Sequence, residues 1–236
     1  MEALLEINLQ LLFSIIGTIA FAVSGAVVAM EEEYDILGVF VLALVTAFGG
    51  GVVRNLLIGI PVTTLWEQGL YLRTAVIAAF LVFIVPVGWI RKWKTWETFF
   101  DAIGLSAFSI QGAMYAAQMN VPLSAIMVAA MLTGIGGGMI RDVLAGRKPL
   151  VLRDEIYAVW GLVAGLVIGL GVLEGPVPVL SLFFAVVALR MLSVQLKWRL
   201  PRRSLRLQDE LPAQVSSAAA ARASGIPDTK EAARGE

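Results

Sequence analysis

The sequence contains neither cysteine nor histidine, and it has few charged residues. The absence of both residue types in the 236 positions excludes disulfides, thiolate nucleophiles, Cys/His zinc sites and histidine proton relays. Only 15% of the residues are charged, against about 25% in a typical soluble domain. The 18 basic and 18 acidic residues cancel, so the charge balance predicts no nucleic-acid partner.

Hydrophobic residues dominate instead, at 58% of the chain with a mean hydropathy of +0.83, which indicates lipid as the solvent. A helix needs about 20 apolar residues to cross a bilayer. The sequence predicts an all-α integral membrane protein with seven transmembrane helices. The start of the chain lacks the basic n-region of a signal peptide, so we expect the first apolar stretch to be retained. The predicted spans are about 9–30, 36–60, 74–90, 99–119, 123–145, 156–173 and 177–196.

Lys and Arg in short loops predict the orientation, because cytoplasmic loops carry an excess of them. With the N-terminus outside, Arg73 is the one basic residue in the outer loops. The inner side then holds the remaining loop charges and a basic C-terminal segment. We therefore expect a cell inner-membrane protein with an outside N-terminus and a cytoplasmic C-terminus. The inner basic residues are Arg91, Lys92, Lys94, Arg147, Lys148, Arg153, Arg190, Lys197, Arg199, Arg202, Arg203 and Arg206.

The composition changes near residue 200, which predicts a transmembrane domain over 1–200 and a disordered cytoplasmic tail over 201–236. Ser, Ala, Pro, Gly and charged residues fill this tail without any apolar period. The basic segment Arg199–Arg206 has two interpretations: it binds anionic membrane lipid, or it only fixes the topology.

An internal repeat organises the membrane part. Residues 17–59 align with 104–146 at a constant offset of 87 without a gap, and about 15 of the 43 positions are identical. The repeats extend over about 9–90 and 97–173, with three helices each, and the seventh helix at 177–196 stands outside them. An odd number of helices inverts the second repeat relative to the first. Inverted repeats are typical of transport folds, with the site near the bilayer midplane.

A glycine triplet occurs in the second helix of each repeat, at Gly49, Gly50 and Gly51 and again at Gly136, Gly137 and Gly138. Three glycines weaken a helix at one level, so we expect both helices to be interrupted there. Unwound carbonyls at that depth can line a cavity and transiently hold a monovalent cation. The alternative is close helix packing through small residues.

Two threonines and two arginines accompany the triplets. Thr46 and Thr133 lie one helical turn before them and line the same predicted cavity, or else bond their own backbone. Arg54 and Arg141 lie three residues beyond, where an ionisable group is expected to be functional, as a gate or in a charge pair, unless it only reaches the headgroups. Asp142 is the acid beside them, and it predicts an ion pair with Arg141 or with Arg54. Its counterpart in the first repeat is Asn55.

The string Gly-Gly-Gly-x-x-Arg-[Asn/Asp]-x-Leu-x-Gly with a following Pro, at 49–61 and again at 136–149, resembles the prokaryotic branch of the trimeric intracellular cation (TRIC) channel family. The resemblance covers about residues 8–195. It implies a homotrimer, one pore per subunit beside the glycine triplets, and selectivity for monovalent cations, chiefly potassium. Small bacterial proteins of this family are also described as glycine transporters.

Three functions therefore compete: a passive potassium or sodium channel, a secondary transporter for glycine or another small amino acid, and a membrane scaffold without transport. An integral-membrane enzyme is the weakest alternative, because the predicted spans hold no paired carboxylates and no His or Cys cluster. We accordingly expect no enzymatic activity, no cofactor and no resident metal ion.

Overall fold

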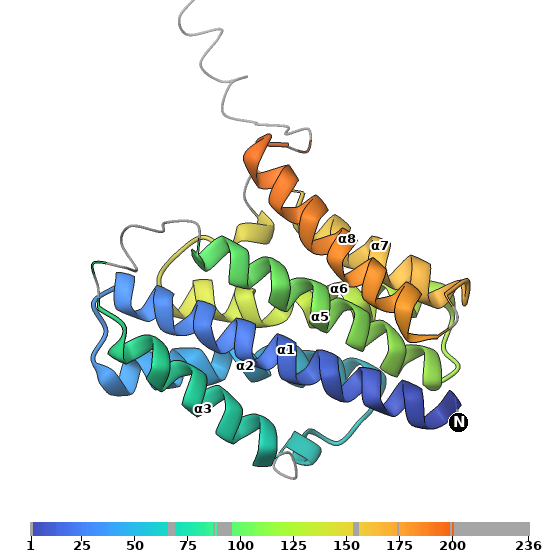
Figure 1. Cartoon of the computed structure of the whole chain (residues 1–236), viewed down its shortest axis with the longest axis horizontal. Helices are drawn as coiled ribbons and strands as arrows, with labels where there is room; N and C mark the ends of the chain where they lie inside the picture. The colour runs from blue at the N-terminus through green and yellow to red at the C-terminus, as the bar shows by residue number, and fades with distance from the viewer. Residues whose placement is uncertain are drawn as a thin grey trace, which may run out of the picture. The chain divides into compact units, whose positions relative to one another are not determined.

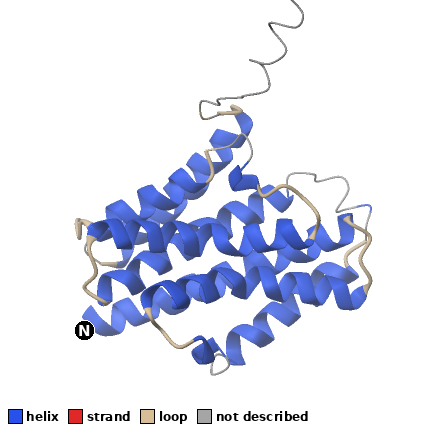
Figure 2. Cartoon of the chain, turned by 180° about the vertical axis from the view of Figure 1, so that it is seen from behind, coloured by secondary structure: helices blue, strands red, loops and turns tan. Residues whose placement is uncertain are grey.

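Helices make up all the regular secondary structure in the computed structural model, for the residues it describes: 2–65, 69–86, 88, 96–152, 156–173, 175–198 and 200. Figures 1 and 2 show this described part as a bundle of helices joined by short connections. The all-α prediction with seven main helices is confirmed. They are α1 (Glu2–Glu31), α2 (Ile36–Ile58), α3 (Gly69–Ile84), α5 (Trp96–Gln118), α6 (Leu123–Leu144), α7 (Ala158–Gly169) and α8 (Pro176–Gln195), with 3-10 turns η1 (Val62–Leu65) and η2 (Leu150–Leu152).

The helix ends follow local chemistry. Asp35 caps α2, because its side chain accepts a hydrogen bond from the backbone N–H of Gly38 at 2.7 Å. Gly59 ends α2 in the left-handed conformation that glycine adopts without cost. α3 begins and ends earlier than the predicted 74–90, and Pro86, which disfavours helix in the residue before it, follows two residues after its end.

Four of the described helices are long and apolar enough to cross a membrane by themselves: Asn8–Glu31 within α1, and α2, α6 and α8. α3 and α7 have 16 and 12 residues, fewer than the about 20 that span the hydrocarbon core. α5 has 23 residues, and it buries polar side chains against its neighbours. This polar helix is thus enclosed by other helices, where protein groups replace lipid around it.

The two repeats show the inverted symmetry in matched contacts. A Cβ atom on Gly17 of α1 would run into the ring of Phe108 on α5, and one on Gly104 of α5 would run into the ring of Phe21 on α1. The two rings pack edge to face with centroids 5.3 Å apart. Each residue of this set lies 87 positions from its counterpart, so α1, α2 and α3 are repeated as α5, α6 and α7.

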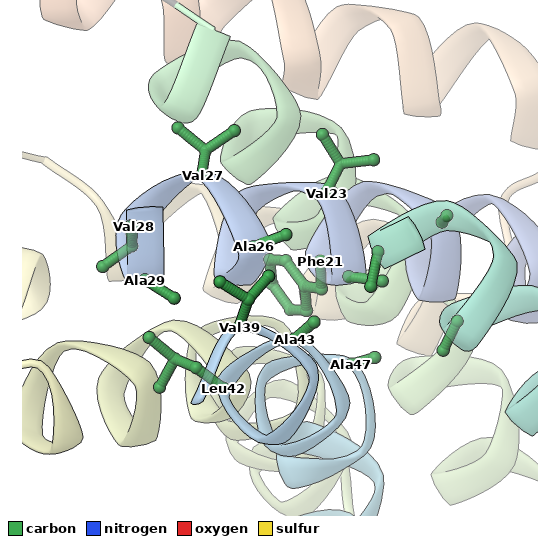
Figure 3. Packing of buried hydrophobic residues seen from close by; sticks show 14 of the residues in the cluster. Phe21, Val23, Ala26, Val27, Val28, Ala29, Val39, Leu42, Ala43 and Ala47 are labelled. Carbon is green, nitrogen blue, oxygen red and sulfur yellow. The ribbon is translucent and has the colours of Figure 1, made fainter. Parts of the chain in front are cut away.

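Small side chains bring the helices of each repeat close together. Figure 3 shows Phe21 and Ala26 of α1 facing Val39 and Ala43 of α2. Gly25 lies against the backbone of Ala43, where a larger side chain would not fit. In membranes such small residues allow the close approach that holds helices together.

Four further glycines, Gly17, Gly25, Gly104 and Gly112, face neighbouring helices of their own chain. They do not offer a face to another subunit, because the rings of Phe21 and Phe108 and the side chains of Thr46 and Thr133 already occupy those faces.

Several predictions lie outside the described residues: the basic loop at 91–94, Arg153, the tail over 201–236, and the arginines of the Arg199–Arg206 segment. Arg190, expected among the cytoplasmic charges, is instead buried in α8 with its guanidinium over the ring of Tyr157, at 4.6 Å from the ring centroid.

Candidate ion pathway between α2 and α6

The two glycine triplets lie where α2 and α6 cross. Both helices run through their triplets without interruption, so the predicted breaks are wrong. A Cβ atom on Gly50 would collide with the carbonyl oxygen of Thr133, and one on Gly137 would collide with that of Thr46. One on Gly136 would come within 3.1 Å of the Cα of Gly50. The glycines therefore serve close packing, and helix-to-helix contact offsets their intrinsic cost in a helix.

The outer members of the triplets contact side chains. A Cβ atom on Gly49 would lie 2.8 Å from Ile140, and one on Gly138 would lie 3.2 Å from both the Asp101 carboxylate and the Tyr157 hydroxyl. Gly51 lines a cavity beside Arg54. The triplets thus connect the crossing point to the polar groups of the site.

Thr46 and Thr133 bond their own helices. Their hydroxyls donate to the carbonyls one turn earlier in their own helices, Leu42 at 2.6 Å and Ala129 at 2.5 Å. Both side chains are fully buried against Gly25 and Gly112. The alternative, bonding of the hydroxyls to their own backbone, therefore holds for both residues.

Arg141 lies at the centre of a buried ionic cluster. Its Nε and Nη2 donate to one carboxylate oxygen of Asp142 at 2.9 and 2.7 Å, and its Nη1 donates to Asp101 at 2.9 Å. Nη1 also donates to the hydroxyl of Ser24 on α1 at 2.5 Å, and Glu97 lies 3.8 Å from Nη2. One guanidinium thereby ties α1, α5 and α6 together.

The other oxygen of Asp142 accepts a hydrogen bond from the backbone N–H of Leu150 at 3.0 Å, which fixes the turn η2 to the end of α6. Arg141 is completely buried and Asp142 is nearly so. The structure thus pairs Asp142 with Arg141 and with no other arginine that it describes. Three acids surround one cation here, so this cluster carries excess negative charge.

Arg54 lies at the equivalent position of the first repeat, with neutral partners. Its Nε and Nη2 donate to the amide oxygen of Asn55 at 3.1 and 2.9 Å, and its Nη1 donates to Gln111 on α5 at 3.1 Å. The guanidinium also lies over the ring of Tyr115, 4.3 Å from its centroid. Gln111 in turn donates to the hydroxyl of Ser14 on α1. Only 4% of Arg54 is exposed. Its side chain is therefore enclosed by protein and does not extend toward the lipid headgroups.

A small cavity of about 20 Å³ lies beside this guanidinium. Its lining includes Ser14, Thr18, Gly51 and Gln111 together with Arg54. This volume holds about one water molecule. The space next to Arg54 is therefore partly polar and too narrow for a hydrated ion to pass, and its remaining lining comes from Ala47, Phe48, Tyr71 and Phe108.

A second arginine borders the Arg141 cluster outside the membrane helices. Arg147 donates to Glu32 at 2.6 Å and to Glu31 at 2.8 Å, both at the end of α1, and to Glu97 of α5 at 3.4 Å. The hydroxyl of Tyr34 donates to the carbonyl of Leu144 at 2.9 Å. These bonds join the loop between α1 and α2 to the end of α6.

Sequence reasoning missed Asp101, which lies near the start of the predicted span 99–119. α5 begins five residues before Asp101, so Asp101 lies inside the helix and bonds Arg141. Ser14 and Tyr157 were missed as well. Extending the repeat alignment upstream by three residues pairs Ser14 with Asp101, and this offset marks both as members of equivalent clusters.

The fold and the site define a class: a multi-pass membrane protein of two inverted three-helix repeats, with an arginine cluster in each repeat. The model of a family described as glycine transporters matches residues 11–86 and 98–171. The chain belongs to this family, and the resemblance to prokaryotic TRIC proteins is confirmed. The UPF0126 membrane protein YvgT of Bacillus subtilis is 59% identical over 198 residues, which are 84% of this chain and 98% of that protein.

Two solved structures share the fold. One comes from work on the structural basis for conductance through TRIC cation channels; it has 36% identity and a TM-score of 0.71, over 82% of this chain and 97% of that one. The other is the TRIC trimeric intracellular cation channel orthologue from Rhodobacter sphaeroides. It has 28% identity and a TM-score of 0.70, over 78% of this chain and 95% of that one.

Proposed function

We propose that this protein is a passive channel for monovalent cations, chiefly potassium, with one pore per subunit along the crossing of α2 and α6. The observation that carries the proposal is the pair of buried guanidinium clusters flanking that crossing, in a fold shared with a TRIC cation channel at 36% identity. Buried ionisable groups inside a membrane bundle mark ion or substrate pathways.

The two clusters have different parts in this proposal. Glu97, Asp101 and Asp142 outnumber Arg141, and a site with excess negative charge attracts cations. Arg54 has the opposite effect, because a guanidinium keeps its charge and repels cations. The cavity beside Arg54 is too small for a hydrated cation, so conduction requires Arg54 to exchange its bonds with Asn55 and Gln111 for other partners. Arg54 is the gate in this scheme, and Arg141 is a fixed clamp.

Transport of glycine is the second candidate, favoured by the family description. A zwitterion would place its carboxylate against the Arg54 guanidinium and its ammonium toward carbonyl or acidic groups. This scheme also needs Arg54 to release its present partners. The channel and the transporter therefore share Arg54 as the gate and differ in the species that crosses the membrane.

Planar bilayers containing the purified protein under a potassium gradient separate the two candidates. We expect discrete unitary currents that reverse near the potassium equilibrium potential, and a changed open probability in Arg54→Gln with little change in selectivity. Ser181→Ala is the matched control, since its exposed hydroxyl only bonds the carbonyl of Val177 in α8. Glycine-dependent flux in the absence of unitary currents would refute the channel and support the transporter.

A further inference from the structure

The two guanidinium clusters differ at one symmetric position. The offset of 87 that relates the repeats pairs Ser14 of α1 with Asp101 of α5. Asp101 contacts Arg141 directly through its carboxylate at 2.9 Å. The Ser14 side chain is shorter, and it meets Arg54 only through Gln111. The first repeat therefore has no carboxylate at the place where the second repeat supplies one.

The cavity of about 20 Å³ lies at that place. Ser14 and Arg54 both line it, with Gln111 and Thr18 adding a further amide and a further hydroxyl. A space of this size accommodates one water-sized species. Its position beside a guanidinium favours an occupant with a negative charge. The rest of the lining is largely apolar and comes from Ala47, Phe48, Tyr71 and Phe108.

The charge of Arg54 requires such an occupant. Arg54 is buried, with 4% of the residue exposed, and its hydrogen bonds go to the neutral side chains of Asn55 and Gln111. Within the described ranges no carboxylate contacts it, whereas three acids surround Arg141. A buried charge without a counter-charge is strongly unfavourable. Its bonds to Asn55 and Gln111 use three of the five guanidinium N–H groups, which leaves two for a ligand.

We propose that the cavity between Ser14 and Arg54 binds one small monovalent anion, a halide or a carboxylate group, in the place that Asp101 fills at Arg141. The bound anion accepts hydrogen bonds from the guanidinium N–H groups that Asn55 and Gln111 do not use. The Ser14 hydroxyl lines the space but donates its own hydrogen bond to the Gln10 carbonyl at 2.7 Å. The anion neutralises the cation that otherwise repels permeating ions. The anion site can be tested separately from cation conduction, because anion binding is measured without any ion flux.

Equilibrium binding of radiolabelled chloride to the purified full-length protein in detergent tests the proposal. We expect saturable binding that unlabelled formate competes away. Arg54→Gln should weaken the binding by about 10- to 150-fold, the range for loss of a charged hydrogen-bond donor. Ser14→Asp should weaken it to a similar degree, because it provides the missing carboxylate internally. Ser181→Ala, whose exposed hydroxyl bonds the carbonyl of Val177 in α8 away from this cavity, is the control and should bind like the wild type.

Competition by glycine identifies the source of the anion. Displacement of chloride by glycine at concentrations similar to formate indicates the carboxylate of a small amino acid, and displacement by formate alone indicates a halide-sized site. Asn55→Asp repeats the Ser14→Asp experiment with a more conservative change, should the first variant fail to fold. It keeps the acceptor oxygen that Arg54 already uses.

Three results would overturn the anion site. The first is an absence of saturable binding of chloride and formate in the wild type. The second is wild-type affinity in both Ser14→Asp and Asn55→Asp. The third is binding that arises only in Glu67→Gln, since Glu67 lies outside the described residues and its carboxylate would then be the counter-charge of Arg54. Unitary potassium currents without anion binding would leave the channel proposal intact and reject this site alone.

Discussion

At the scale of single residues, the same short motif produces two different sites. Arg54 and Arg141 follow identical glycine triplets, yet one bonds neutral amides and the other bonds carboxylates. The difference arises from residues on other helices, Ser14 and Gln111 in one case and Asp101 and Ser24 in the other. The motif alone therefore identifies the arginines, and the partners determine what each arginine does.

Replacing each arginine by glutamine should separate these functions. Arg141→Gln leaves Asp101 and Asp142 buried without their cation, and breaking a buried ion pair from one side costs about 3–5 kcal/mol. Arg54→Gln removes a charge whose partners are neutral, so it should cost less stability and instead raise potassium leak. Thermal unfolding in detergent and potassium flux from liposomes measure the two effects.

Lysine at the same positions serves as the control for charge. It keeps the cation but loses the planar fork that Nε and Nη2 present to one oxygen. Arg141→Lys should therefore remain well below the wild type in stability. Equal thermal stability of Arg141→Gln and Arg54→Gln would contradict the assignment of a clamp and a gate.

The glycine triplets give a second prediction at this scale. Gly50→Ala places a Cβ against the Thr133 carbonyl, and over-packing of this kind costs about 1–3 kcal/mol. Gly69→Ala is the matched control, because no atom lies within 4 Å of its added Cβ. A lower unfolding temperature for Gly50→Ala alone, measured side by side, is the expected result. If Gly50→Ala were as stable as Gly69→Ala, the triplets would not be packing contacts.

At the scale of elements, ion pairs join the end of α1 to the segment that follows α6. Arg147, after the end of α6, contacts Glu31 and Glu32 at the end of α1. These side chains are 23% to 38% exposed, so each contact is worth only about 0–1 kcal/mol. The connection nevertheless links the two repeats through segments more than 100 positions apart in the sequence.

Arg147→Gln should consequently produce a small, salt-dependent loss of stability. We expect a decrease of up to about 1 kcal/mol at low ionic strength, and a smaller one in 1 M salt, where the screening length falls to about 3 Å. Thermal unfolding of the variant and the wild type across a salt series measures this. Lys148→Gln, next in sequence and absent from these ion pairs, is the control. A loss that does not change with salt would mean that Arg147 acts through packing.

At the scale of the whole molecule, assembly and orientation remain predictions. The described helices expose apolar side chains such as Ile77, Phe80 and Leu81 of α3, which suit contact with lipid or with another subunit. We expect a homotrimer formed by the membrane helices. Truncation after Leu200 should leave the trimer intact in cross-linking, with the full chain as control. If the truncated protein were monomeric, the tail would be the part that holds the trimer together.

The orientation is tested by a reporter fused after Glu236. The distribution of Lys and Arg predicts a cytoplasmic C-terminus, so a phosphatase that is active only outside the cytoplasm should stay inactive there. The same reporter after Gly175, between α7 and α8, should be active, because one helix separates the two points. Reversed activities would invert the repeats relative to the membrane and leave the fold unchanged.

Composition and periodicity determined the membrane class, the seven helices and the inverted duplication. Burial in lipid requires long apolar segments, and a gene duplication leaves identical residues at a constant offset. The buried arginines were also visible, since charge inside an apolar span is rare. Each of these features is either local in the sequence or repeated along it, so it can be recognised from one sequence.

Only the tertiary structure decided whether the triplets break or pack, and which groups meet each arginine. The free energy of three glycines in a helix depends on what approaches them, and the carbonyls of Thr46 and Thr133 come from the facing helix. Asp101 was missed because its partner lies 40 positions away on α6. Contacts between helices determine the free energies of these glycines and ion pairs, and the residue spacing along one helix does not reveal those contacts.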